Sequence, residues 1–171
     1  SNIFRDSVYA GMPDFNRFSS GQEFGTHWIP TETDVSIRPG WYYHKEQDSM
    51  VKSLNKLIDI YFNSVGLNSS LLLNIPVDRR GLIHENDSLK LNQLGKFIKN
   101  TFSHNLALKG EIKTSSNNFK KIKNIINDDD HNTYWYPKKE DKESIIEIRF
   151  KNPVFANVLK ISENINLGQR I

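Results

Sequence analysis

A short apolar run between two amphipathic segments constrains the fold of this chain more than any other feature. Residues 69–77 (SSLLLNIPV) contain three consecutive leucines, Leu71 to Leu73, in a run too short for a helix. Such a run is typical of a strand that is covered on both faces, as in a parallel sheet. Apolar residues recur at helical spacing on either side, in residues 48–65 and 87–102. With a further strand-like segment in residues 26–45, the order of elements predicts an α/β fold.

The first predicted helix carries signals at both ends. Asp48 or Ser49 can cap its start through a side-chain oxygen. Gly66 fits the position just beyond its end, where a left-handed residue is common. The pattern therefore predicts a helix over residues 48–65.

A polar turn follows the leucine-rich strand. Asn74 lies where the strand leaves the sheet, so its side chain could point into the mouth of a barrel formed by such strands. Asp78 can form an ion pair with Arg79 or Arg80 that pins the turn, and Gly81 suits a position with positive φ. This turn therefore predicts a structural role for the charged residues in it.

The pattern changes near residues 103–105. Afterwards the apolar residues alternate with period 2 in short runs, and no helical period appears. The members of these runs are Ile145, Ile146, Ile148, Phe150, Val154, Phe155, Val158, Leu159 and Ile161. They predict an antiparallel β domain, a sandwich, over residues 104–171, after an α/β part over residues 1–103.

Composition excludes several classes of function. Lys and Arg number 23 against 20 Asp and Glu, and a net charge of +3 spread along the chain gives no argument for nucleic-acid binding. No stretch approaches the ~18–20 consecutive apolar residues of a membrane helix. The chain has no Cys, which excludes disulfides, thiolate metal sites and a cysteine nucleophile.

The segment from Trp28 to His44 concentrates the groups that sugar sites use. Trp28 and Trp41 offer flat faces that can stack on a sugar ring. Glu32 and Asp34 can accept hydrogen bonds from neighbouring hydroxyls or transfer protons, and Arg38 can orient a carboxylate. The segment therefore predicts a carbohydrate site in which these five side chains take part.

Strand geometry would order this site. Because side chains alternate along a strand, Glu32, Asp34 and Ser36 would share one face and the residues between them the other. A plainer interpretation also stands: a Glu-x-Asp pair usually lies on a solvated face, a Trp beside Gly and Pro usually anchors packing, and His27 and His44 usually make structural hydrogen bonds. Taken alone, the residues indicate a carbohydrate-like site without fixing its substrate.

An acidic loop over residues 127–135 is a candidate metal site. Closely spaced oxygen ligands such as Asp128, Asp130 and Thr133 suit Ca²⁺, which takes 6–8 of them. The spacing is not that of an EF-hand, and a solvated acidic loop is the alternative. Trp135 would then be a core residue of the sandwich.

Two motifs resemble the α-L-fucosidases, the family 29 glycoside hydrolases. They run from Trp28 to His44 and from Leu71 to Gly81, and the chain looks most like the branch that prefers α-1,3/1,4-fucosyl linkages. The departures are Thr33 in place of Cys, Tyr42 in place of Phe, and Val77 in place of a second Pro.

The second half resembles a discoidin-like sandwich. Asn105-Leu106-Ala107 resembles its start, and residues 128–135 resemble its Asp-Gly-Asp…Thr-Tyr-Trp loop, with Asp129 in place of the Gly. The two resemblances together cover about residues 20–171, and they imply the last strands and helices of a (β/α)₈ barrel followed by the start of a sandwich.

The fucosidase resemblance implies a retaining exo-α-L-fucosidase that needs no cofactor. Retention uses two carboxylates about 5 Å apart and a covalent glycosyl-enzyme. The family's nucleophile is an Asp upstream of Ser1, and Glu32 is assigned to the pocket wall, with acid/base catalysis as its alternative role. Trp41 resembles the family's aromatic platform for fucose, beside Trp28, Asp34 and Arg38.

The resemblance also implies partners and a location. The partners would be a fucosylated oligosaccharide or glycoconjugate and an upstream part of the barrel, and the location the periplasm or the exterior. Two βα units cannot close an eight-stranded barrel, so we expect this piece alone to fold poorly or to need a partner chain. The alternative functions are a non-catalytic carbohydrate-binding module, through Tyr134 and Trp135, and an α/β scaffold without a site.

Overall fold

The structure is a computed structural model of all 171 residues. It describes residues 2–3, 27–28, 31–116 and 125–164. The chain divides into two compact units, Ser1–Thr101 and Phe102–Ile171. The division lies beside the boundary near residue 104 that the change in sequence pattern suggests, and each unit is described by itself below.

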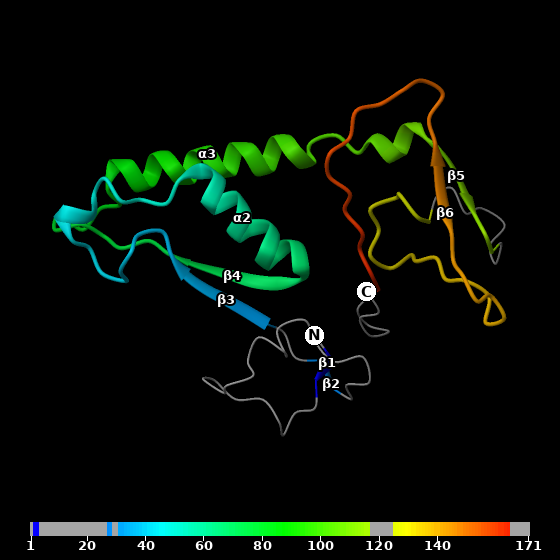
Figure 1. Ribbon diagram of the computed structural model, residues 1–171, viewed down its shortest axis with the longest axis horizontal. Coiled ribbons are helices and arrows are strands. Elements are labelled where there is room, and N and C mark those ends of the chain that lie inside the picture. The colour runs from blue at the N-terminus through cyan, green and yellow to red at the C-terminus, as the bar shows by residue number, and fades with distance from the viewer. Residues whose placement is uncertain (1, 4–26, 29–30, 117–124, 165–171) are drawn as a thin grey trace. The chain divides into compact units, whose positions relative to one another are not determined.

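The first unit alternates strands and helices as the sequence pattern predicts. Strand β3 (Thr31–Ser36) precedes helix α2 (Leu54–Ser64), and strand β4 (Ser69–Asn74) precedes helix α3 (Glu85–Phe102) (Figure 1). β3 and β4 pair in parallel along their whole length. A parallel pair needs a crossover connection, and α2 supplies it, so this part of the chain is a βαβ unit.

A second, shorter strand pair lies earlier in the chain. β1 (Asn2–Ile3) and β2 (His27–Trp28) are antiparallel, with Asn2 opposite Trp28. For these four residues the structure describes the backbone and not the side chains.

The core of the first unit forms where both helices meet one face of the sheet. Ile37, Leu57 and Leu94 are buried there, one from the end of β3 and one from each helix. Partly buried apolar side chains pack around them: Val51, Leu54, Ile58, Ile60, Leu73, Ile75, Leu91 and Ile98. Most apolar positions of the two stripes face this core, whereas Val65, Leu89 and Phe102 are 41–54% exposed. Packing against the sheet stabilises helix α2, whose 11 residues would form only a marginal helix as an isolated peptide.

Helix α2 begins later than the sequence suggested. Its N-cap is Ser53, whose side chain accepts the backbone N–H of Lys56, so the prediction of a cap at Asp48 or Ser49 is wrong. A 3-10 turn, η2 (Lys45–Gln47), and an extended stretch precede the helix, and the Asp48 carboxylate is taken by Arg38 instead.

The end of α2 also differs from the prediction. The helix continues into a 3-10 turn, η3 (Val65–Leu67), and the left-handed residue is Asn68, with φ of 64°. Gly66 lies inside that turn and is not the residue with positive φ. Asn is the residue other than Gly that most readily takes this conformation, so the chain had two candidates, Gly66 and Asn68, two positions apart.

The leucine run forms a strand, but only one face of it is covered. Leu72 is 51% exposed, whereas Leu71 and Leu73 are half-buried toward the helices. The parallel pairing is confirmed, and the expectation of burial on both faces is wrong for this chain. The physical reason is that α2 and α3 cover one face, and none of the described residues packs on the other.

The turn after β4 confirms its predicted structural role. The Asp78 carboxylate accepts from Arg80 at 2.6 and 2.8 Å, and Arg80, not Arg79, is the partner. Gly81 has φ of 77°, the conformation that its position in the turn requires. The Arg80 hydrogen bonds, with those from backbone N–H groups, hold the pKa of Asp78 below its ordinary value.

The second unit contains a 3-10 turn and one small sheet. Turn η4 (Leu106–Lys109) leads to strand β5 (Glu111–Thr114), which pairs antiparallel with β6 (Ile146–Arg149). Gly110 lies between turn and strand, and a Cβ there would overlap the side chain of Ile148.

The second β run of the predicted sandwich does not form a strand here. Residues 151–164 contain no strand, and Phe155 is 90% exposed, so the apolar run from Val154 to Ile161 does not form a strand in the described structure. The reason is that a strand needs a partner to satisfy its backbone, and none of the described residues offers one to this run. The sandwich itself stays a prediction. None of the described helices is long and apolar enough to cross a membrane.

Candidate functional site

The open face of the β3–β4 pair carries the carboxylates singled out from the sequence. Glu32 and Asp34 are exposed, while Thr33 and Val35 between them are half-buried. The register places Glu32 beside Ser70 and Asp34 beside Leu72. The expected alternation along β3 is therefore present, and this face offers two carboxylates, a hydroxyl and an apolar patch to a ligand or to another part of the protein.

An exposed indole lies just beyond the carboxyl end of the same strand. Trp41 is 49% exposed and follows the loop that leaves β3. The Asn74 amide, at the carboxyl end of β4, donates to the main-chain oxygen of Trp41 at 2.9 Å. The carboxyl ends of both strands thus meet at this loop, which is where open α/β sheets bind ligands.

Arg38 lies inside the protein and not on the open face. Its side chain is 0% exposed; its Nη2 lies 2.8 Å from the Asp87 carboxylate, and its Nη1 lies 2.9 Å from that of Asp48. The ring of Tyr43 covers the guanidinium at 4.9 Å. The prediction that Arg38 orients a substrate carboxylate is therefore corrected: two carboxylates of its own chain already neutralise it, so it holds the loop after β3 to helix α3.

Asp48 joins several polar side chains at this point. It accepts from Arg38 at 2.9 Å and from the Tyr43 hydroxyl at 3.2 Å, and His84 Nε2 lies 3.3 Å away. Partial burial opposes the charge of Asp48, but the Arg38 hydrogen bond and the nearby His84 outweigh it and lower the pKa of Asp48 below its ordinary value. Burial and the Asp48 carboxylate raise the pKa of the Tyr43 hydroxyl.

Lys52 ties the same loop from the side of α2. Its ammonium donates to the main-chain oxygens of Ser36 at 2.6 Å and of Arg38 at 3.1 Å. Burial, together with the charge of Lys56, lowers the pKa of Lys52. Sequence reasoning missed both Lys52 and Asp87. The sequence offered one signal for them. Lys52 in the predicted helix 48–65 and Asp87 in the predicted helix 87–102 are charged residues close to the apolar stripe of their helix.

The structure brings some predicted site residues together and leaves one undescribed. Glu32 and Asp34 share the open face of β3, and Trp41 lies beyond its end. For Trp28 only the backbone is described, in β2, so the prediction for its indole lies outside what the structure describes.

The carboxylates in the acidic loop of the second unit accept hydrogen bonds from other residues of the same loop. Asp128 accepts from the Asp130 backbone at 3.0 Å and from the Thr133 hydroxyl at 2.7 Å, and Asp130 accepts from Asn132 at 2.9 Å. These hydrogen bonds, the Asp130 N–H first, lower the pKa of Asp128. Across the described residues no group of three His, Cys, Asp or Glu side chains is arranged to hold a metal. The calcium site expected on Asp128, Asp130 and Thr133 stays a prediction.

The same loop explains the residue that departs from the sandwich pattern. Asp129 has φ of 60°, a left-handed conformation that Gly adopts without strain. Asp tolerates this conformation better than most residues, so the loop keeps a turn suited to Gly with Asp in its place.

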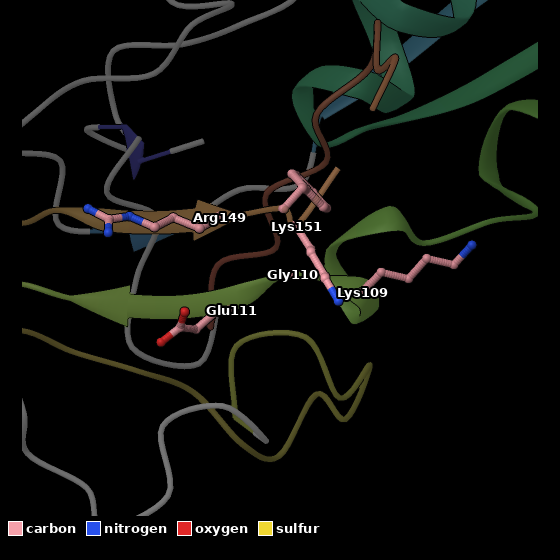
Figure 2. Close-up of a pocket in the computed structure, with 6 residues that line it drawn as sticks. Lys109, Gly110, Glu111, Arg149 and Lys151 are labelled. Atoms are coloured by element: carbon pink, nitrogen blue, oxygen red, sulfur yellow. The ribbon is translucent and has the colours of Figure 1, made fainter. Parts of the chain in front are cut away.

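A shallow hollow beside β5 and β6 does not form a site. Lys109, Gly110, Glu111, Arg149, Phe150 and Lys151 line it. Figure 2 shows the Lys109 side chain extending to the opposite side from those of Glu111 and Arg149, and Arg149 donates to Glu147 at 2.6 Å. Its cations do not converge on a common ligand.

Comparison with known proteins gives a consistent result. The family model described as "Alpha-L-fucosidase" matches residues 5–103. "Alpha-L-fucosidase 1" of Arabidopsis thaliana is 39% identical over 98% of this chain and 33% of its own length.

Two solved structures extend the comparison. A crystal structure from Bacteroides thetaiotaomicron, provisionally assigned as an alpha-L-fucosidase, matches 77% of this chain and 29% of its own, at 45% identity and a TM-score of 0.71. A Ruminococcus gnavus family 29 fucosidase, solved with fucose, matches 67% of this chain and 24% of its own, at 34% identity and a TM-score of 0.60.

The parallel strand pair with its crossover helix defines part of an α/β protein, and its exposed carboxylates and indole are groups that carbohydrate sites use. More particularly, the chain belongs to the α-L-fucosidase family, on the match over residues 5–103. It spans about a third of the length of the curated relatives it matches, 33% of one and 31% of the other.

Proposed function

We propose that this chain forms one wall of the fucose pocket in a retaining exo-α-L-fucosidase. In this proposal β3, α2, β4 and α3 are the last part of a (β/α)₈ barrel, and residues 104–171 begin a sandwich domain. The observation that carries it is the open face of the parallel pair, where exposed Glu32 and Asp34 lie on a strand that leads to the half-exposed indole of Trp41. Catalytic residues of such barrels lie at the carboxyl ends of strands.

Each side chain has a distinct part in this pocket. The Trp41 indole would stack on the apolar face of the sugar, as an amphipathic aromatic surface does. Glu32 and Asp34 would accept hydrogen bonds from sugar hydroxyls, because ionised carboxylates are pure acceptors. Glu32 is a wall residue, and acid/base catalysis is its alternative role.

The two carboxylates that perform the chemistry would lie outside this chain. A retaining mechanism needs a nucleophile and an acid/base about 5 Å apart. Glu32 and Asp34 lie two residues apart on one strand face, which suits a wall of acceptors on one side of a sugar better than a pair that flanks its glycosidic bond. The linkage cleaved would be α-1,3/1,4, and the enzyme would act in the periplasm or outside the cell.

Fucose release tests this proposal directly. The 171-residue chain and a version extended to the length of its relatives would each be incubated with a fucosylated Lewis-type oligosaccharide, and free fucose measured. We expect activity only in the extended protein. Fucose release by the short chain would place the catalytic pair within residues 1–171 and overturn the assignment of Glu32 to the pocket wall.

A further inference from the structure

The loop that leaves β3 is held by hydrogen bonds to successive backbone groups. Ile37 donates its N–H to the Asn74 carbonyl at 2.9 Å, continuing the pairing of the two strands by one residue. The Ser36 hydroxyl then donates to the carbonyl of Gly40 at 2.7 Å. The Asn74 amide donates to the carbonyl of Trp41 at 2.9 Å. The loop is thereby folded back over the end of its own strand.

Asn74 connects these contacts because its amide carries two donors. One hydrogen goes to the Ser36 hydroxyl oxygen, with a nitrogen–oxygen distance of 3.2 Å, and the other goes to Trp41. Ser36 and Asn74 are also register partners across the two strands. Asp in place of Asn74 would have the same shape but could donate to neither oxygen when ionised.

The buried side of the loop is fixed separately. Arg38 is enclosed by Asp87 and Asp48, and Lys52 donates to the carbonyl of Ser36 at the end of β3 and to that of Arg38 in the loop. The side chain of Trp41, in contrast, is 49% exposed, so packing cannot fix it by itself. The hydrogen bond from Asn74 is the contact in this set that fixes the backbone of the tryptophan residue itself.

We propose that Asn74 is a positioning residue of the sugar site, which fixes the Trp41 backbone and so sets where the indole meets the sugar. The proposal rests on the proposed function, in which Trp41 contacts fucose. A side chain that binds through its flat face is sensitive to small displacements, because stacking falls off once the ring tilts or slides. Asn74 acts through Trp41 and need not touch the substrate.

The test is a double-mutant cycle in the full-length fucosidase that contains this chain. With para-nitrophenyl α-L-fucoside, Asn74→Ala should raise KM about five- to tenfold, the factor expected for one lost hydrogen bond, and change kcat by less than about twofold. A purely structural role would reduce the amount of active enzyme, which lowers kcat and leaves KM unchanged.

The second half of the cycle repeats the change in a Trp41→Ala background. If Asn74 acts through the indole, Asn74→Ala should have no further effect on KM there. The same factor in both backgrounds, or an unchanged KM in the single variant, would overturn the proposal. An unchanged kcat/KM in Trp41→Ala alone would instead overturn the pocket assignment on which it rests.

Two further variants keep the test decisive. Asn74→Asp preserves the volume and removes both donors, so it should raise KM by a similar factor even where Asn74→Ala fails to fold. Asn92→Ala is the matched control, because Asn92 makes a local hydrogen bond to Ser88 within helix α3, far along the chain from the loop. We expect its KM to equal that of the unaltered enzyme.

Discussion

Arg38 carries its charge in a place that water does not reach. Its guanidinium is enclosed by Asp87, Asp48 and the Tyr43 ring, with no side-chain exposure. A buried charge is tolerated only when it is paired, and removing one partner leaves the other uncompensated. At this scale the residue that resembled a substrate contact is instead part of the interior.

We expect Arg38→Met to destabilise the full-length protein by about 3–5 kcal/mol, because it leaves the buried Asp87 carboxylate without its counter-charge. Urea unfolding at neutral pH would measure the loss. Arg79→Met is the control, since Arg79 is exposed in the turn after β4 and should change the unfolding free energy by less than about 0.5 kcal/mol. Equal stability of the two variants would contradict this account of Arg38.

The same cluster makes stability depend on acidity. The pKa of Asp48 is lower in the folded protein than its ordinary value of 3.8. Its contribution is therefore fully present above that ordinary value and is lost as the pH falls through the lower, folded value. We expect the unfolding free energy to fall more steeply in acid for the unaltered protein than for Asp48→Asn, in urea titrations at a series of pH values. Parallel curves would contradict the prediction.

At the scale of elements, one side-chain hydroxyl determines where helix α2 begins. Ser53 caps it by accepting the Lys56 N–H at 3.3 Å. We expect Ser53→Ala to lower the unfolding free energy by about 1 kcal/mol, the usual effect of losing such a cap. Ser49→Ala is the matched control and should have no measurable effect, because Ser49 lies outside the helix. A larger loss of unfolding free energy in Ser49→Ala than in Ser53→Ala would contradict this assignment and favour the cap at Ser49 suggested by the sequence.

Two glycines, Gly110 before β5 and Gly95 in helix α3, should respond in opposite ways to replacement by alanine. A Cβ at Gly110 would overlap Ile148, whereas a Cβ at Gly95 meets nothing within 4 Å. We expect Gly110→Ala to destabilise the second unit by about 1–3 kcal/mol and Gly95→Ala to stabilise α3 by about 0.5–1 kcal/mol. Hydrogen exchange of the two units would show both effects, and protection of β5 unaltered by Gly110→Ala would contradict the first.

The elements that sequence could predict are those fixed by local pattern. The stripes of α2 and α3 and the alternation in β3 depend on residues a few positions apart, so they were found. The start of α2 could not be found, because Asp48, Ser49 and Ser53 can all cap a helix. The choice depends on Arg38, ten positions before Asp48, which takes that carboxylate. Likewise, the apolar residues within 154–161 suggest β structure, but forming a strand needs a partner strand, which the pattern of this segment does not reveal.

At the scale of the whole molecule, the open face of the β3–β4 pair should decide how cooperatively the chain unfolds and whether it self-associates. Leu72 is half-exposed on it, and none of the described residues covers that face. We expect the 171-residue chain alone to unfold without a sharp transition or to self-associate, and the extended protein to melt cooperatively. Calorimetry and sedimentation would measure this, and a monomeric short chain with a single sharp transition would contradict it.

The anchored loop after β3 has a thermodynamic consequence. Its backbone is tied by hydrogen bonds from Asn74, Ser36 and Lys52, which all belong to the chain itself. The conformational entropy of the loop is therefore lost when the protein folds and not when the ligand arrives. Cutting the Asn74 tether would move that loss to the binding step, so the weaker binding of an untethered indole would be seen as a less favourable entropy of association, with the heat released little changed.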